Sequence, residues 1–112
     1  MKFERQLLKG IAPVVVLQIL ANGKMYGYEL SKAIAQKSQD ILTLGQGTLY
    51  PLLYNLEAQK LIVAEEEIAP SGRKRRYYSI TSKGTERLAT DKAQLSDLFG
   101  ALKLVFGSTV FN

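Results

Sequence analysis

One block of the sequence, residues 47–81, constrains the fold more than any other part of the chain. It opens with GTLYPLLYNLEAQKLI, where Leu49, Leu52, Leu53 and Leu56 recur at the spacing of a single buried helix face. A short acidic segment follows, and a Pro-Ser-Gly turn then leads into RKRRYYSIT. The pattern predicts one helix followed by an antiparallel hairpin of two strands.

The helix of this block is predicted to start with Thr48 as its N-cap, which places Pro51 in the first turn. Its outward face would be small and neutral and would carry hydrogen-bonding side chains, as base edges in a major groove require. The candidate DNA contacts on this helix are Gln46, Thr48, Tyr50, Tyr54 and Asn55. The plainer interpretation is an ordinary polar surface, in which Thr48 only caps the helix and Tyr50 packs against the preceding helix.

The hairpin is predicted to pair residues 62–68 with residues 76–80. Alternation along the second strand places Tyr78 on the inward face with Ile80 and leaves Tyr77 more exposed. Four consecutive cations and this tyrosine are candidate phosphate contacts, namely Arg73, Lys74, Arg75, Arg76 and Tyr77. The alternative is a solvated hairpin tip whose cations pair with the glutamates at 65–67.

The rest of the chain is predicted to be helical. Residues 2–9 would form one or two amphipathic turns, after which Gly10 and Pro13 break or restart the helix. A second helix is expected over residues 26–37, and a last one over residues 82–106 with Thr81 as its cap.

The last helix is too long and too apolar toward its end for so small a domain to cover. The pattern therefore predicts dimerisation with a second copy through Leu88, Leu95, Leu98, Phe99, Leu102, Val105 and Phe106. Phe99 is also a candidate for lining an effector pocket, because such pockets are apolar, aromatic and often lie between helices. Dimer core is the competing interpretation for the same side chain.

Composition excludes several classes of function. The chain has 112 residues and no cysteine or histidine, so disulfides, Cys or His zinc sites and triads with a histidine base are excluded. We expect no catalytic residue, no metal site and no cofactor, and hence not an enzyme. The longest apolar run is about half of the roughly 20 residues that a membrane span needs, so a cytoplasmic protein without a membrane partner is expected. The net charge of +5 is compatible with a polyanionic partner.

Three segments resemble the PadR-like transcriptional regulators: MYGYELSKAI at 25–34, GTLYPLLYNLEAQKLI at 47–62 and SGRKRRYYSITSKG at 71–84. The resemblance is to short members with a single C-terminal helix. It implies a mainly α fold with a small β-hairpin (α+β), a winged helix-turn-helix. Residues 1–81 would be the DNA-binding domain with its N-terminal helix, and residues 82–112 the dimerisation helix, together forming one compact unit.

The resemblance also implies a function. A family member of this kind would be a bacterial, nucleoid-associated repressor that binds a pseudo-palindromic operator in double-stranded DNA as a homodimer. A small hydrophobic or phenolic effector would release it. The sequence departs from many relatives at Asn55, where they carry Arg or Lys, and at Lys60, where they carry Gly. An alternative of another class is a winged-helix adaptor that binds protein and shows no sequence preference on DNA.

Overall fold

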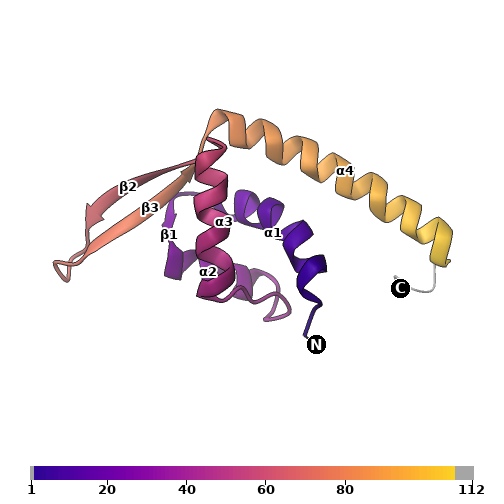
Figure 1. The fold of residues 1–112 in the computed structure, drawn as a ribbon, viewed down its shortest axis with the longest axis horizontal. Coiled ribbons are helices and arrows are strands. Elements are labelled where there is room, and N and C mark those ends of the chain that lie inside the picture. The colour runs from indigo at the N-terminus through magenta and orange to yellow at the C-terminus, as the bar shows by residue number, and fades with distance from the viewer. Residues whose placement is uncertain (1, 108–112) are drawn as a thin grey trace.

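The computed structural model describes residues 2–107, which form four helices and a three-stranded antiparallel sheet (Figure 1). The expected C-terminal unit therefore has its last five residues, 108–112, outside the described part. The elements in chain order are α1 (Arg5–Leu20), β1 (Met25–Tyr26), α2 (Gly27–Lys37), α3 (Gln46–Ala58), β2 (Ile62–Ile68), β3 (Lys74–Ile80) and α4 (Ser82–Phe106).

Helix α1 is continuous, and the predicted break at Gly10 and Pro13 is wrong. The Glu4 side chain caps the helix by accepting a hydrogen bond from the Gln6 amide at 3.0 Å. Pro13 lies inside the helix, where it removes one backbone donor. The loss is tolerated because almost every residue that follows it packs into the core, and burial outweighs local propensity. The buried residues of α1 are Ala12, Val14, Val16, Leu17, Ile19 and Leu20.

Helix α3 begins at Gln46, two residues before the predicted start. Gly45 is its N-cap, and the Gly45 carbonyl accepts from the amides of Thr48 at 3.1 Å and Leu49 at 2.9 Å. The prediction that Thr48 caps the helix, with Pro51 in its first turn, is therefore wrong. A glycine can cap a helix through backbone geometry alone, which a search for Ser or Thr does not detect.

The sheet has the strand order β1-β3-β2, so the predicted hairpin is confirmed and gains a third strand. Strand β1 has only two residues, Met25 and Tyr26, which is too short for an alternating pattern to reveal it. Strand β3 starts at Lys74 rather than at residue 76. The wing, which we define as β2, β3 and the turn between them, is therefore longer than predicted.

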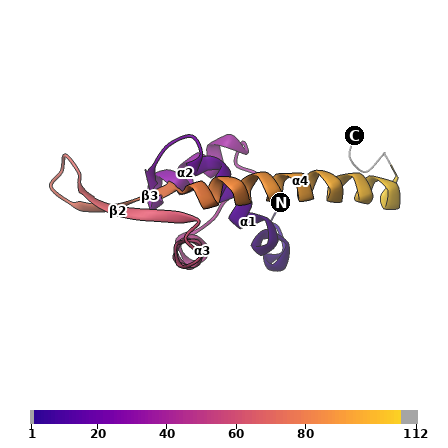
Figure 2. The ribbon, with the colours of Figure 1, turned by 90° about the horizontal axis from the view of Figure 1, so that it is seen from above.

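The core lies where α1, α2 and α3 meet the inner face of the sheet. The predicted inward position of Tyr78 is confirmed, since it is buried there beside the leucines of α3. The predicted Thr81 cap of α4 is also confirmed, because its hydroxyl accepts from the Gly84 amide at 3.0 Å. The wing and the far end of α4 lie at opposite ends of a molecule 54 Å long (Figure 1, Figure 2).

Candidate nucleic-acid interface

The outward face of α3 is polar, neutral and open to solvent. Leu49, Leu53 and Leu56 are fully buried and fix the orientation of the helix, while Leu52 is partly buried. The predicted contact residues all lie on exposed positions: Gln46, Thr48, Tyr50, Tyr54 and Asn55. Tyr54 is 77% exposed and Tyr50 is 45% exposed, so the two tyrosines differ in how far they reach from the protein.

Two contacts with α2 hold the beginning of α3 in place. The Ser31 hydroxyl donates to the Leu44 carbonyl at 3.0 Å, directly ahead of α3. A Cβ atom on Gly27 would lie only 2.7 Å from the Tyr50 hydroxyl oxygen, so the glycine lets α2 approach α3 closely. The expected packing of Tyr50 against α2 is thus compatible with its partial exposure.

Asn55 is held in position by the residue one turn later. The Gln59 amide donates to the Asn55 side-chain oxygen at 3.2 Å. An amide oxygen has two lone pairs, and the Asn55 amide nitrogen keeps its two donors, so the side chain still has capacity for a further partner. Asn55 is therefore an oriented hydrogen-bonding group on the exposed face of α3.

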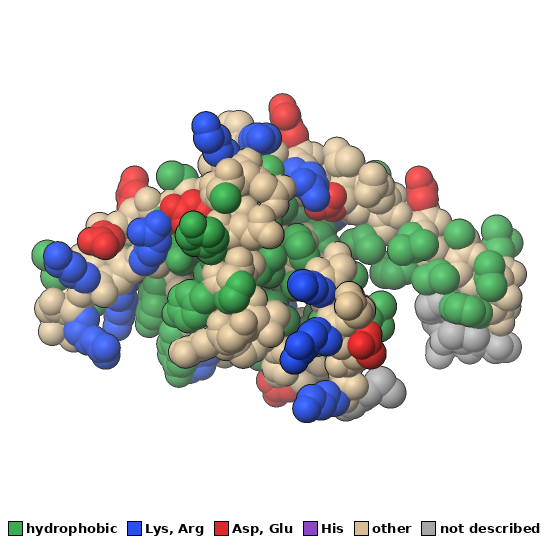
Figure 3. Space-filling view, in the orientation of Figure 1, with side chains coloured by type: hydrophobic (Ala, Val, Ile, Leu, Met, Phe, Trp, Pro, Cys, Tyr) green, Lys and Arg blue, Asp and Glu red, His purple; other side chains and the backbone are tan. Residues whose placement is uncertain are grey.

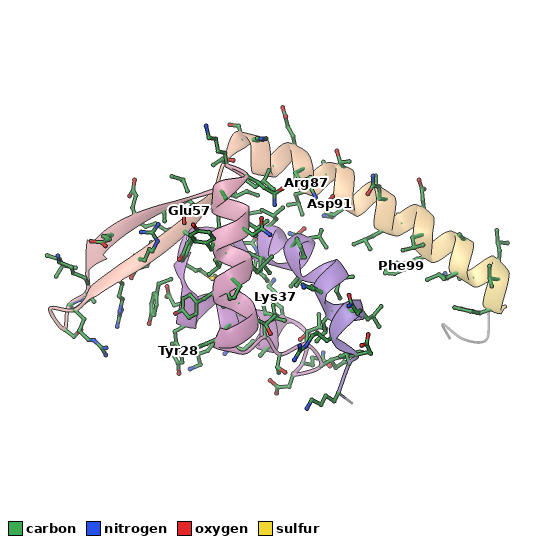
Figure 4. The ribbon with its side chains drawn as sticks, in the orientation of Figure 1. Tyr28, Lys37, Glu57, Arg87, Asp91 and Phe99 are labelled. Atoms are coloured by element: carbon green, nitrogen blue, oxygen red, sulfur yellow. The ribbon has the colours of Figure 1, made fainter. Side chains whose placement is uncertain are left out.

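Arg76, near the middle of β3, ties the wing to α3. Its guanidinium donates to the Glu57 carboxylate at 2.7 Å and lies 5.9 Å from the centre of the Tyr78 ring. The hydrogen bond that Arg76 donates to Glu57 raises the pKa of Arg76, and burial raises the pKa of Tyr78. Figure 4 shows Glu57 on the side of α3 that faces the wing.

An open groove of about 520 Å³ lies between α3 and β3. Its lining combines aromatic rings with the Arg76–Glu57 ion pair, and it consists of Tyr50, Tyr54, Glu57, Ala58, Arg76 and Tyr78. The ion pair therefore joins the two walls of the groove.

Arg75 lies on the other face of the sheet. Its guanidinium stacks over the Tyr26 ring at 4.4 Å from the ring centre. Tyr77 meets the same ring edge to face at 5.5 Å and is half-buried, which agrees with its predicted greater exposure than Tyr78. Lys24 forms an ion pair with Glu67 across this face.

The four cations that were predicted to contact phosphate are consequently not one uniform patch. Arg73 and Lys74 are exposed at the tip of the wing, and neither takes part in an ion pair within residues 2–107. Arg75 and Arg76 are engaged on opposite faces of β3. Figure 3 shows Lys and Arg side chains gathered over the free end of the wing. The predicted alternative, pairing of the four cations with residues 65–67, is seen for none of them.

The apolar face of helix α4 is buried near the start of the helix and exposed toward its end. Leu88 is 7% exposed and belongs to the core of the protomer, so its predicted place in a dimer interface is corrected. Leu95 and Leu102 are partly buried, and Leu95 packs against the core. The remaining predicted residues are at least half exposed, namely Leu98, Phe99, Val105 and Phe106.

Figure 3 shows apolar side chains along the distal part of α4, and Figure 4 shows Phe99 on the side turned toward α1. Sequence reasoning missed Leu104, which is 88% exposed on the opposite side of the helix.

A second groove, of about 260 Å³, lies between α1 and α4. Its walls are mostly apolar but include the Arg87–Asp91 ion pair at 3.0 Å, and they are formed by Gly10, Pro13, Val14, Arg87, Asp91, Gln94, Leu95 and Leu98. Phe99, the candidate effector residue, is not among these residues. Within residues 2–107 no three His, Cys, Asp or Glu residues gather as a metal site would require.

None of the helices in residues 2–107 has both the length and the apolar character that crossing a membrane requires.

Comparison with known proteins places this arrangement among regulators of transcription. Residues 16–90 match the model of the transcriptional regulator PadR-like family. The chain is 30% identical over 94 residues to the transcriptional regulator Rv3488 of Mycobacterium tuberculosis, covering 84% of each protein. It is 32% identical over 92 residues to a Lysinibacillus sphaericus protein called uncharacterized protein X, covering 82% of this chain and 78% of that one.

Solved structures agree with the sequence matches. A PadR-like transcriptional regulator from Bacillus cereus superimposes with a TM-score of 0.77 at 31% identity, covering 91% of this chain and 97% of that one. A Streptococcus transcriptional regulator gives a TM-score of 0.76 at 33% identity, covering 91% and 98% of the two chains.

Proposed function

This chain belongs to the PadR-like family of transcriptional regulators, whose members are not enzymes, and from that premise we propose that it is a dimeric repressor. Its target would be a pseudo-palindromic operator in double-stranded DNA. It would act in the cytoplasm of a bacterial cell, associated with the nucleoid. A small hydrophobic or phenolic effector would release it from the operator.

The observation that carries the proposal is the neutral, exposed face of α3 next to a basic wing tip. In the proposed complex α3 enters a major groove and presents Gln46, Thr48 and Asn55 to base edges. Asn55 has the donors and the acceptor needed for a bidentate contact with adenine, and its bond from Gln59 orients it in advance. Tyr54, the more exposed of the two tyrosines, would contact sugar or phosphate.

The wing would supply affinity and placement. Arg73 and Lys74 are exposed at its tip and suit contacts with the phosphates beside the groove. Arg75 stacks on the Tyr26 ring, so it would contact only a phosphate that lies beside the edge of that ring. Arg76 is engaged with Glu57, so its proposed role is to hold the wing against α3.

The distal apolar face of α4 supports a homodimer. Leu98, Phe99, Val105 and Phe106 expose half or more of their surface in one protomer, which is typical of residues that a second copy covers. A two-fold axis between the copies would match an operator dyad, with half-sites about 34 Å apart or a multiple of that distance.

Release by an effector is proposed as a population shift. A ligand that binds better to a dimer with displaced recognition helices lowers operator occupancy. The groove between α1 and α4 is the space nearest to Phe99 along the chain, since Leu98 in its wall directly precedes Phe99. Covering by a second copy would complete the walls of such a site.

Selection of bound sequences from a random DNA pool, followed by footprinting at stated salt, tests the proposal. The expected result is an inverted repeat with both halves protected. Binding without sequence preference, together with isolation of the protein in a hetero-complex, would contradict it and favour a protein-binding adaptor.

A further inference from the structure

The C-terminal end of α3 is fastened directly to the N-terminal end of α4. Three successive carbonyls after α3, those of Gln59, Lys60 and Leu61, accept hydrogen bonds from Thr81 and Lys83. The Thr81 amide also donates to the Leu61 carbonyl at 3.1 Å. We call this set of contacts the α3–α4 joint. It connects residues about 20 positions apart without passing through the wing.

Thr81 serves both helices at once. Its hydroxyl proton is shared between the Lys60 carbonyl at 2.8 Å and the Leu61 carbonyl at 3.0 Å. The same oxygen accepts from the Gly84 amide at 3.0 Å and so caps α4. One side chain therefore closes the end of α3 and starts α4.

Gly84 lets the first turn of α4 approach the backbone after α3 without a gap. A Cβ atom at this position would lie 2.1 Å from the Leu61 carbonyl oxygen and 2.8 Å from Cγ1 of Ile80. Both distances are too short for a real contact, so the first turn of α4 rests directly on the backbone after α3. Lys83 adds a bond from its amine to the Gln59 carbonyl at 3.1 Å.

The end of α3 has a conformation that suits this contact. Lys60 has a φ of 63°, and the Leu61 amide donates to the Leu56 carbonyl at 3.0 Å while the Lys60 amide donates to the Glu57 carbonyl at 2.9 Å. This pair of bonds is the Schellman arrangement, which ends a helix in a defined direction. The carbonyls that follow are then in place to accept from Thr81.

We infer that the α3–α4 joint sets the angle between the helix that reads DNA and the helix that pairs the two copies. Thr81 is its positioning residue, since it contacts both helices and touches no DNA in the proposed complex. The joint thereby fixes the separation and relative rotation of the two recognition helices. The inference rests on the proposed function, because it needs a dimer on an inverted repeat.

If the joint is rigid, the dimer should bind tightly only to operators whose two half-sites have one particular spacing. One added base pair rotates one half-site about 35° around the DNA axis relative to the other. A dimer with rigid joints meets this change only by deforming the DNA, whereas a loosened joint lets α3 turn on α4. The spacing preference therefore reports the stiffness of the joint.

The decisive variant is Thr81→Asp in the full chain. Aspartate caps a helix well, so α4 keeps its cap, but an ionised carboxylate has no proton to donate to the carbonyls of Lys60 and Leu61. Thr81→Ser keeps both functions and serves as the conservative rescue. Ser82→Ala is the matched control, one residue away on an exposed position.

Each protein is titrated with the selected operator and with versions that are one base pair longer or shorter. The ratio of the affinities is the readout, because a smaller folded fraction lowers both affinities equally and leaves their ratio unchanged. The wild-type protein, Thr81→Ser and Ser82→Ala should each discriminate by at least about tenfold. Thr81→Asp should discriminate by less than about threefold while remaining a dimer.

A folded Thr81→Asp dimer with the wild-type ratio would overturn the inference and leave the proposed function intact. A wild-type protein that shows no spacing preference would also overturn the inference, whereas the proposed function is overturned only if no inverted repeat is selected. If Thr81→Asp does not fold, Lys83→Met removes only the exposed bond to the Gln59 carbonyl. Its ratio should fall by about twofold, and an unchanged ratio would overturn the inference.

Discussion

Helices α3 and α4 both bury one face, yet they leave very different surfaces exposed. The face that α3 leaves open is neutral and polar, and its most exposed large side chain is a tyrosine. The distal half of α4 leaves leucine, valine and phenylalanine open along a continuous stripe. A hydrated polyanion with hydrogen-bonding edges suits the first surface, and an apolar surface suits the second. The same chain thus presents two surfaces for two kinds of partner.

A charge in the middle of the apolar stripe of α4 should have the largest effect. Phe99→Asp places a carboxylate where the proposed second copy packs, at a cost of about 3 kcal/mol or more, so the dimer dissociation constant should rise by at least about 100-fold. Sedimentation over a range of concentrations measures it. Leu104→Glu, on the opposite side of the same helix, is the control and should remain dimeric. An unchanged Phe99→Asp dimer would contradict the proposed interface.

On α3, the change that tests the exposed polar face is Asn55→Ala. It should remove about 1–3 kcal/mol of discrimination between the selected operator and a scrambled duplex, which is about fivefold to 150-fold. Affinity for the scrambled duplex should hardly change, because no phosphate contact is lost. Competition binding at one salt concentration measures both. Gln36→Ala, an exposed amide on α2, is the control and should leave both affinities as they are. If the affinities for both duplexes fell equally, Asn55 would contact the DNA backbone and not a base.

The wing offers a comparison between the cations at its tip and Arg76 farther along β3. Replacing both Arg73 and Lys74 with alanine should lower the slope of log affinity against log salt by about 2, since each phosphate contact contributes about 0.9. Arg76→Gln should leave the slope unchanged, because Glu57 already holds that guanidinium. A slope that falls equally for Arg76→Gln would show that the ion pair opens on DNA.

The smallest expected effect concerns the residue after α3. Lys60 has left-handed backbone geometry at a φ of 63°, which glycine adopts without strain. Lys60→Gly should therefore stabilise the protein by about 1 kcal/mol and raise the melting temperature by a few degrees. Lys60→Ala removes the charge but keeps the Cβ atom, so it should give no such gain. Calorimetry of both variants separates strain from charge.

The elements that depend on a repeating pattern could be predicted from the sequence. The leucine stripe of α3, the inward Tyr78 and the whole extent of α4 follow from periods of 3.6 and 2. The cap at Thr81 followed from its side-chain chemistry. These features are local, so a single sequence contains the information that they need.

The features that were not predicted from the sequence depend on contacts between residues far apart in the chain. The two-residue strand β1 exists only because β3 pairs with it, and α1 continues through Pro13 because of its buried neighbours. The ion pair that removes Arg76 from the cation cluster joins residues 19 positions apart. Leu88 belongs to the protomer core for the same kind of reason, since α4 packs on α1. A run of like charges or of leucines in the sequence does not show which of these residues already contact other parts of the same protomer.

In the proposed dimer, the exposed stripe on α4 would also determine how sharply the regulator responds to its own abundance. Below the dimer dissociation constant, most copies would be single protomers, and the amount of the DNA-binding form would rise with the square of the total concentration. Doubling the protein would then quadruple the operator-bound pool. A cell that adjusts expression of this chain would obtain a steeper response than from a regulator that binds one site as a single protomer, with a threshold set by the side chains at 98, 99, 105 and 106.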